Sequence, residues 1–303
     1  MSYTIRNLEH GRWIDIQKPT EIDIEFLKKE FPFIHPTNLE DSLERVQHSK
    51  MDINEKYLFL STVIPMGIEP VKKMTSFEVS FFLTNNDLIT ITHQETSLFT
   101  SEQADEGEIA DISLPETPVL LMYRFLEKLY EMSDKNITKI TKAVQRIDDT
   151  ILVVKSPDII REIAFLQRNI IYFITTLVTT IPLFVELEKK DLSYDKSGMK
   201  EYWGDIADKL NSQKDTLEDY NLLLRTLSKA HEMFINHRMN SIMSVLTVFS
   251  VIFLPLNLIA GIYGMNLNYL PFADSANGFI EITFLMVLVA VGLFSFFKLR
   301  EWI

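Results

Sequence analysis

Residues 242–266 read IMSVLTVFSVIFLPLNLIAGIYGMN, an apolar run without a charged side chain that ends in the tripeptide Gly264-Met265-Asn266. At about 1.5 Å of rise per residue, a helix over residues 242–262 can cross a hydrocarbon core of about 30 Å. A second apolar run covers residues 279–297 and holds a single acid near its start. The sequence therefore predicts two transmembrane helices joined by a short loop at 264–278.

Composition narrows the class of protein further. The chain has 303 residues, a formal net charge of −12 and no cysteine. The acidic balance argues against nucleic acid as a partner and permits attraction of cations. Without cysteine, disulfides and thiolate metal ligands are excluded. We find no phosphate-binding loop, nucleophile elbow or metalloprotease helix, so neither an enzyme nor a resident cofactor is expected.

The distribution of cationic residues predicts the orientation in the membrane. His237 and Arg238 precede the first apolar run, and Lys298 and Arg300 follow the second, whereas residues 267–277 contain no Lys or Arg. By the positive-inside rule, both termini lie in the cytoplasm and the tripeptide lies at the outer mouth. The first ten residues lack an apolar stretch, so we expect no signal peptide and a location in the inner or plasma membrane.

The chain divides into three predicted domains, which are residues 1–115, 116–240 and 241–303. The first reads as α/β, and the second is dominated by long helices. The third holds the two spans. The fold class is thus an α+β domain, an α/β sandwich followed by long helices, with two transmembrane helices. Within these domains we expect strands over 57–64, 77–83 and 88–93, and helices over 21–30, 38–48, 119–154 and 158–188.

The helix at 158–188 contains an apolar stretch, residues 170–185, that invites assignment as a third span. Four threonines and Pro182 interrupt this stretch, and its length is at the lower limit for a span. A third span would also place the C-terminal cations and the large N-terminal domain on opposite sides of the membrane. We therefore expect a buried helix of the water-exposed domain.

A very long helix should follow from about residue 199. Between residues 199 and 260 the only glycine is Gly204, and no proline occurs before Pro255. Such a helix is on the order of 90 Å long and cannot be stable without neighbours along its length. Oligomerisation is the natural source of those neighbours. Two helices joined near Gly204 are the alternative, and they need partners as well.

One face of the first span is unusually polar for a membrane helix. Polar groups that face lipid remain unsatisfied, so this face should contact protein or water. Packing between helices is one explanation, because small and polar residues favour it. A ring of such helices around a channel is the other, with apolar positions as constrictions. The residues of this pore stripe are Asn240, Met243, Leu246, Ser250, Leu254, Asn257 and Gly261.

The sequence YGMN at 263–266, preceded by PLNLIAGI at 255–262, resembles the signature of the CorA-type magnesium and cobalt transporters. The resemblance covers the whole chain. It implies a funnel-shaped homo-pentamer that moves Mg²⁺, and also Co²⁺ and Ni²⁺, under control of intracellular Mg²⁺. It also implies that Gly264, Met265 and Asn266 form the selectivity filter. The N-terminal part of the likeness consists of Ile34-His35-Pro36, Leu39-Glu40-Asp41, Gln47 and Lys50.

The same resemblance implies a regulatory metal site between subunits. Asp205 aligns with an aspartate of the family's stalk helix, and Glu69 is the candidate partner in the N-terminal domain. The loop departs from the family, because Leu270-Pro271-Phe272 stands where many members have Met-Pro-Glu. The outer carboxylate ring is therefore missing or moved to Asp274 or Glu281.

Two other functions stay open. A zinc transporter of the same fold, with or without coupling to protons, usually carries Ile where Met265 stands. A membrane-tethered scaffold without a conducting path would retain the two spans but needs no polar stripe. The preferred ion, the ring size and the choice between channel and proton-coupled transport do not follow from the sequence.

Overall fold

The computed structural model describes residues 3–44, 48–67, 74–94, 96, 117–151, 157–192, 198–265, 270–271, 277–300 and 302. Contacts group the chain into two units, Met1–Ser228 and Lys229–Ile303. The longest helix, α6 (Lys200–Tyr263), begins in the first unit and ends in the second. The three predicted domains, with boundaries at residues 115 and 240, remain a division made on sequence.

The first unit is built on a six-stranded sheet with strand order β1-β2-β6-β5-β4-β3. All neighbouring strands are antiparallel except the parallel pair β2–β6. The three predicted strands are confirmed as β4, β5 and β6, whereas β1, β2 and β3 were not predicted. The strands are β1 (Tyr3–Leu8), β2 (Gly11–Gln17), β3 (Lys50–Ile53), β4 (Leu58–Met66), β5 (Thr75–Leu83) and β6 (Asp87–Thr92).

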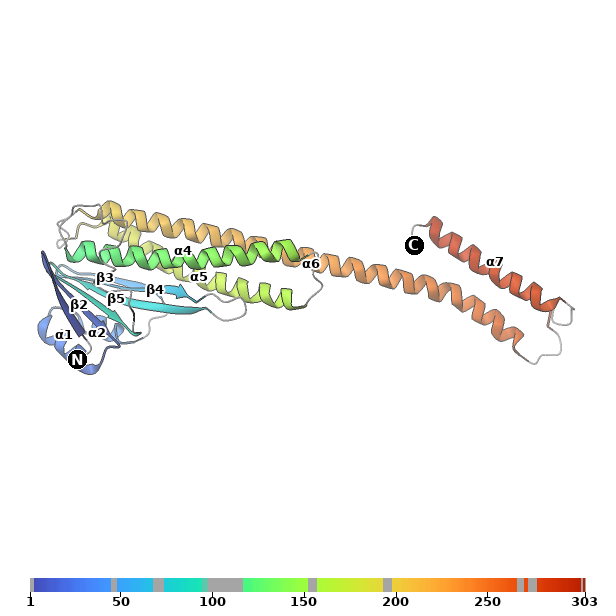
Figure 1. Cartoon of the computed structure of the whole chain (residues 1–303), viewed down its shortest axis with the longest axis horizontal. Helices are drawn as coiled ribbons and strands as arrows, with labels where there is room; N and C mark the ends of the chain where they lie inside the picture. Colours follow the sequence, from blue (N-terminus) through green and yellow to red (C-terminus); the bar gives the residue numbers. More distant parts are fainter. Residues whose placement is uncertain are drawn as a thin grey trace. The chain divides into compact units, whose positions relative to one another are not determined.

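Helices cover both faces of this sheet (Figure 1). On one face, α1 (Glu21–Glu30) and α2 (Pro36–Asp41) pack on a core that includes Phe59. On the other face, α4 (Pro118–Thr150) and α5 (Pro157–Lys189) contact the strands, and the buried side of α6 joins the same core. Successive residues of β4 alternate between the two cores, as a strand covered on both sides requires. The predicted α/β sandwich followed by long helices is confirmed.

The predicted helix over 38–48 is wrong beyond residue 41. The helix α2 spans Pro36–Asp41, and the described residues 42–44 and 48 are not helical. The Ser42 hydroxyl donates to the Leu39 carbonyl oxygen at 2.7 Å, which competes with continuation of the helix. Lys50 then forms an ion pair with Asp41, so two residues of the N-terminal likeness tie α2 to the start of β3.

Packing assigns α5 to the core of the first unit. Within the described residues, three helices are long and apolar enough to cross a membrane, namely α5, α6 and α7 (Gly278–Leu299). Their most apolar windows differ in burial, which is 44% for α5, 6% for α6 and 0% for α7. The α5 threonines bond within the protein, for example Thr180 to the Ser49 hydroxyl at 2.7 Å. The buried side of α5 fits a domain helix, as predicted.

The second unit contains the rest of α6 and α7, and the predicted spans fall inside these two helices. The helix α6 runs without a break over 64 residues, so the alternative joint near Gly204 is absent. A few contacts link α6 to the end of the chain. Ser244 donates a hydrogen bond to the Trp302 carbonyl oxygen at 3.0 Å, and Val248 and Phe297 are buried.

A glycine with a positive φ angle fixes the turn between β1 and β2. Gly11 has φ +135°, and a Cβ atom there would lie 2.3 Å from the Asn86 carbonyl oxygen and 2.9 Å from Pro118 Cγ. The adjacent Arg12 N–H donates to the same Asn86 oxygen at 2.7 Å. The turn is therefore pressed against the β5–β6 hairpin and the start of α4, and only glycine fits.

We predict that Gly11→Ala lowers the free energy of unfolding of the full chain by about 3 kcal/mol or more, because strain and a steric clash add together. Gly198→Ala is the matched control, since Gly198 has φ +70° and no atom within 4 Å of an added Cβ. This control should cost about 1 kcal/mol. Denaturant unfolding in mild detergent measures both, and equal losses would contradict the packing described for Gly11.

Candidate functional site

The seven residues of the pore stripe lie on one face of α6, and all are exposed in the single chain. Leu254 is 69% exposed, whereas Val248, which lies elsewhere around the helix, is 4% exposed. The chain therefore covers a different side of α6 and leaves the stripe open. The stripe is therefore accessible, as a pore lining requires.

Hydrogen bonds show which residues of the stripe need a partner. The Ser250 hydroxyl donates to the Leu246 carbonyl oxygen at 2.9 Å, so its donor is satisfied within the helix. The side chains of Asn240 and Asn257 make no hydrogen bond within the described part of the chain. An amide has two donors and an acceptor, and leaving them unpaired in lipid is costly. The requirement for a polar neighbour in the membrane thus rests on Asn257, which lies within the predicted span 242–262, rather than on Ser250.

The helix α6 ends at the predicted filter. Its last residue is Tyr263, and the Gly264 N–H still donates to the Ala260 carbonyl oxygen at 2.9 Å. Gly264 does not adopt a positive φ angle, but an added Cβ would lie 3.2 Å from that same oxygen. Close packing at the helix end, rather than left-handed backbone, therefore favours glycine there. Met265 is described and is 54% exposed, while Asn266 lies outside the described residues.

Of the two candidate outer acids, only Glu281 lies within the described residues. Glu281 lies exposed in the first turn of α7, where a carboxylate interacts favourably with the helix N-terminus. Asp274 lies outside the described residues. A carboxylate is thus present close to the loop end of α7, although the family's usual position after the tripeptide has none.

The candidate regulatory residue Asp205 lies exposed on α6 in the first unit. Its carboxylate forms no ion pair or hydrogen bond within the described residues. It is close enough to Tyr123 of α4 to act on it electrostatically. Burial raises the pKa of the Tyr123 hydroxyl, and the negative charges of Glu127 and Asp205 raise that pKa further. Glu127 and Asp205 therefore both act electrostatically on the Tyr123 hydroxyl, which lies between α4 and α6.

Glu127 did not emerge from the sequence as a site residue. That it acts on the same tyrosine as Asp205 depends on how α4 packs against α6, and the two residues are 78 positions apart (205 − 127). No group of three or more His, Asp or Glu side chains within the described residues is arranged to hold a metal ion. Glu69, the predicted partner of Asp205, lies outside the described residues. A cation at Asp205 would accordingly need ligands from a second subunit or from the rest of the chain.

Known proteins resemble this chain over most of its length. The family described as "CorA-like Mg2+ transporter protein" matches residues 9–299. The chain is 25% identical to YfjQ of Bacillus subtilis, over 96% of this chain and 89% of that protein. It is 24% identical to the cobalt/magnesium transport protein CorA of Thermotoga maritima, over 96% of this chain and 83% of that protein.

The fold is also shared with a solved structure. The complete structure of the CorA magnesium transporter from Methanocaldococcus jannaschii matches with a TM-score of 0.83 and 22% identity, covering 97% of this chain and 92% of that one. The match includes both the sheet-based unit and the apolar helices. With the family matching nearly end to end, the chain belongs to the CorA-like Mg²⁺ transporter family, whose members move divalent metal ions across membranes.

Proposed function

We propose that the chain forms a divalent cation channel in which a ring of copies surrounds a pore lined by the stripe on α6. The observation that carries this proposal is the stripe itself, which is exposed along its length and leads to Gly264-Met265-Asn266. The two asparagines leave amide groups that only water or a neighbouring copy can satisfy. A ring of copies supplies both water and neighbouring copies, and the family resemblance favours a pentamer.

The transported ion is proposed to be Mg²⁺, with Co²⁺ and Ni²⁺ as further substrates. Mg²⁺ holds an octahedral shell of water and dehydrates reluctantly, so a filter works best on the hydrated ion. Neutral amide oxygens of Asn266 and backbone carbonyls at the end of α6 can bind that shell without trapping it. Two relatives are cobalt/magnesium transport proteins, which supports this choice.

The orientation proposed places both termini in the cytoplasm of the inner or plasma membrane. His237 and Arg238 lie on α6 just before the predicted span 242–262, and Lys298 and Arg300 come just after the predicted span 279–297. The sheet-based unit then lies in the cytoplasm, where it meets intracellular Mg²⁺. In that orientation the tripeptide meets incoming cations first.

Closure is proposed to occur at the apolar positions of the stripe. Met243, Leu246 and Leu254 are exposed in the single chain, and rings of such side chains can exclude water from a narrow pore. Mg²⁺ bound near Asp205 between subunits would replace repulsion of carboxylates by attraction. Shifting a two-state equilibrium from mostly open to mostly closed takes about 5.5 kcal/mol, and a ring shares that among its copies.

Two alternatives are distinguishable by experiment. A zinc transporter of this fold, coupled to protons, usually has Ile in place of Met265, and the match to a Mg²⁺ transporter family does not favour it. A scaffold without a conducting path would leave Asn257 without a function in the span. Neither alternative nor proposal involves catalysis.

Ion flux into proteoliposomes tests the proposal directly. We expect uptake of Mg²⁺, Co²⁺ and Ni²⁺ by the full chain that does not require a proton gradient. Asn266→Ala should lower uptake at least tenfold, because it removes the ring of amide oxygens while deleting little packing. Asn268→Ala is the matched control in the same loop and should stay within twofold of the parent. Uptake that requires a proton gradient and prefers Zn²⁺ would favour the first alternative, and an inactive parent chain the second.

Regulation is tested by the Mg²⁺ concentration that halves the flux. Asp205→Ala should raise that concentration at least severalfold without changing ion selectivity, because the proposed intersubunit site loses a ligand. Asp208→Ala is the matched control, since Asp208 is also exposed one helical turn further on α6. Asp205→Lys should lower flux even without Mg²⁺ by supplying a fixed positive charge. An unchanged response in both Asp205 variants would remove this residue from regulation.

A further inference from the structure

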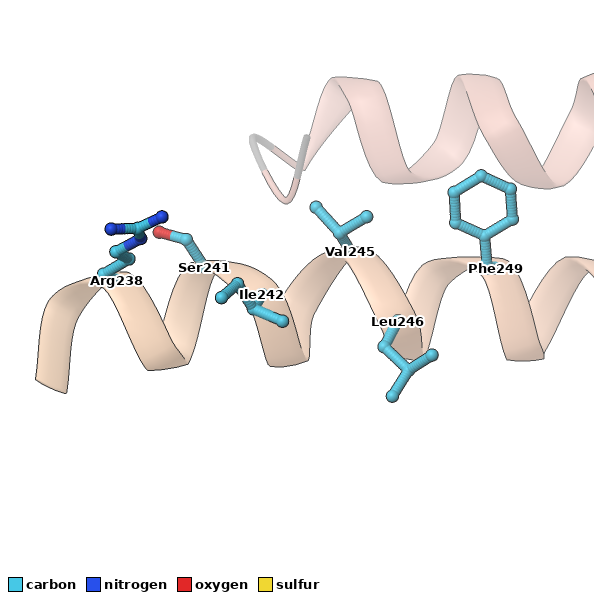
Figure 2. A pocket seen from close by; sticks show the side chains of 6 residues that line it. All are labelled: Arg238, Ser241, Ile242, Val245, Leu246 and Phe249. Carbon is cyan, nitrogen blue, oxygen red and sulfur yellow. The ribbon is translucent and has the colours of Figure 1, made fainter. Parts of the chain in front are cut away.

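An open groove lies on α6 close to the cytoplasmic end proposed for the first span. It has a volume of about 410 Å³, within the range of about 300–1,000 Å³ typical of small-molecule sites. All the residues that line it come from the second unit. Figure 2 shows Arg238 and Ser241 at one end of the groove and Phe249 at the other. The lining residues are Arg238, Ser241, Ile242, Val245, Leu246 and Phe249.

This groove does not belong to the proposed pore. Arg238, Ile242, Val245 and Phe249 follow spacings of four, three and four residues, which is one helix face. At about 100° per residue, the centre of that face is roughly 120° around α6 from the centre of the pore stripe. Leu246 alone belongs to both sets. In a ring with the stripe on its axis, the groove opens away from that axis.

The groove is amphipathic along its length. Arg238 forms no ion pair or hydrogen bond within the described residues, and the Ser241 hydroxyl donates to the His237 carbonyl oxygen at 3.1 Å. The remaining lining side chains are apolar. From Arg238 to Phe249 the helix rises about 16 Å, roughly half of a hydrocarbon core of about 30 Å. The groove thus has a cationic side chain at the membrane surface and an apolar part that extends about one leaflet deep.

We propose that this groove binds an anionic phospholipid of the cytoplasmic leaflet, with its phosphate at Arg238 and an acyl chain along Val245 and Phe249. The planar guanidinium matches a phosphate by two parallel hydrogen bonds, and its apolar stem can extend along the helix. The proposal needs α6 to cross a bilayer, but it does not depend on ion conduction.

Charge complementarity favours a lipid over a second copy as the occupant. At this end of the two helices the sequence supplies Arg238, Lys298 and Arg300 against one acid, Glu301. A neighbouring copy brings the same surplus of positive charge. An anionic leaflet, by contrast, attracts basic residues beside a membrane helix. The surplus remains unbalanced unless negative headgroups surround the ring.

Native mass spectrometry of the full chain tests this binding. The protein in mild detergent is titrated with phosphatidylglycerol or with phosphatidylcholine of the same acyl chains. We expect one phosphatidylglycerol per chain to bind preferentially, and Arg238→Gln to weaken it about fivefold, the effect of one basic residue at an anionic surface. Lys298→Gln removes one charge at the same end but no residue that lines the groove, and it should weaken binding less than Arg238→Gln does. Equal losses in the two variants, or equal binding of the two lipids, would overturn the proposal.

Tryptophan fluorescence gives a second readout that reports position. Trp302 belongs to the second unit, where its carbonyl oxygen accepts a hydrogen bond from Ser244 in the same part of α6 as the groove, whereas Trp13 and Trp203 are buried in the first unit. Phosphatidylglycerol with brominated acyl chains should quench Trp302 more than brominated phosphatidylcholine does at the same fraction of the bilayer. Trp302→Phe supplies the background, and Arg238→Gln should abolish the difference. Equal quenching by the two lipids in the parent chain would show that the groove has no headgroup preference.

Discussion

The hydrocarbon core of a bilayer offers no hydrogen-bond partner to a side chain, and the rest of the structure depends on how α6 meets this constraint. Asn240 and Asn257 lie on a face of α6 that the chain leaves uncovered. Their amides have to bond to water or to other copies. A monomer in lipid leaves the Asn257 amide, which lies within the predicted span 242–262, without a partner, whereas a ring with the stripe on its axis supplies both neighbours and water. The proposed assembly and the proposed conduction thus both follow from the same constraint.

The sheet-based unit supplies packing partners to the first part of α6, whereas the exposed part of α6 has few such partners within the chain. Before the membrane, α6 is held along one side by Trp203, Leu210, Leu217 and Leu224, all of which are buried with α4 and α5. Gln213 adds a polar contact by donating to the Asp134 carboxylate of α4 at 2.6 Å. One continuous helix links these contacts to the span. A change in packing between the sheet-based units of neighbouring copies can therefore reach the proposed pore without a separate connecting element. Asp205 and Glu127 lie at this helix contact, which is the physical reason to look for regulation there.

Much of this fold followed from sequence because the deciding signals are local. Length and apolarity predicted α6 and α7, and β-branched and aromatic runs predicted β4, β5 and β6. The strand β2 pairs with the preceding β1 on one side, but its parallel partner β6 begins 70 positions after β2 ends (87 − 17), a pairing that no local signal predicts. The end of α2 depends on a single Ser42 hydrogen bond. The neighbourhood of Asp205 could not be predicted without a resemblance, since an exposed aspartate on a helix carries no signal of its own.

The central claim is that one face of α6 lines an aqueous path, and the absence of cysteine makes it directly measurable. Ser250→Cys and Asn257→Cys place a thiol on the stripe, while Phe249→Cys and Leu256→Cys place one on adjacent residues of the opposite face. In proteoliposomes, a charged, membrane-impermeant thiol reagent should modify the two stripe variants and block their Mg²⁺ flux, leaving the other two unmodified. Equal reactivity within each adjacent pair, or modification of the opposite face alone, would contradict the account.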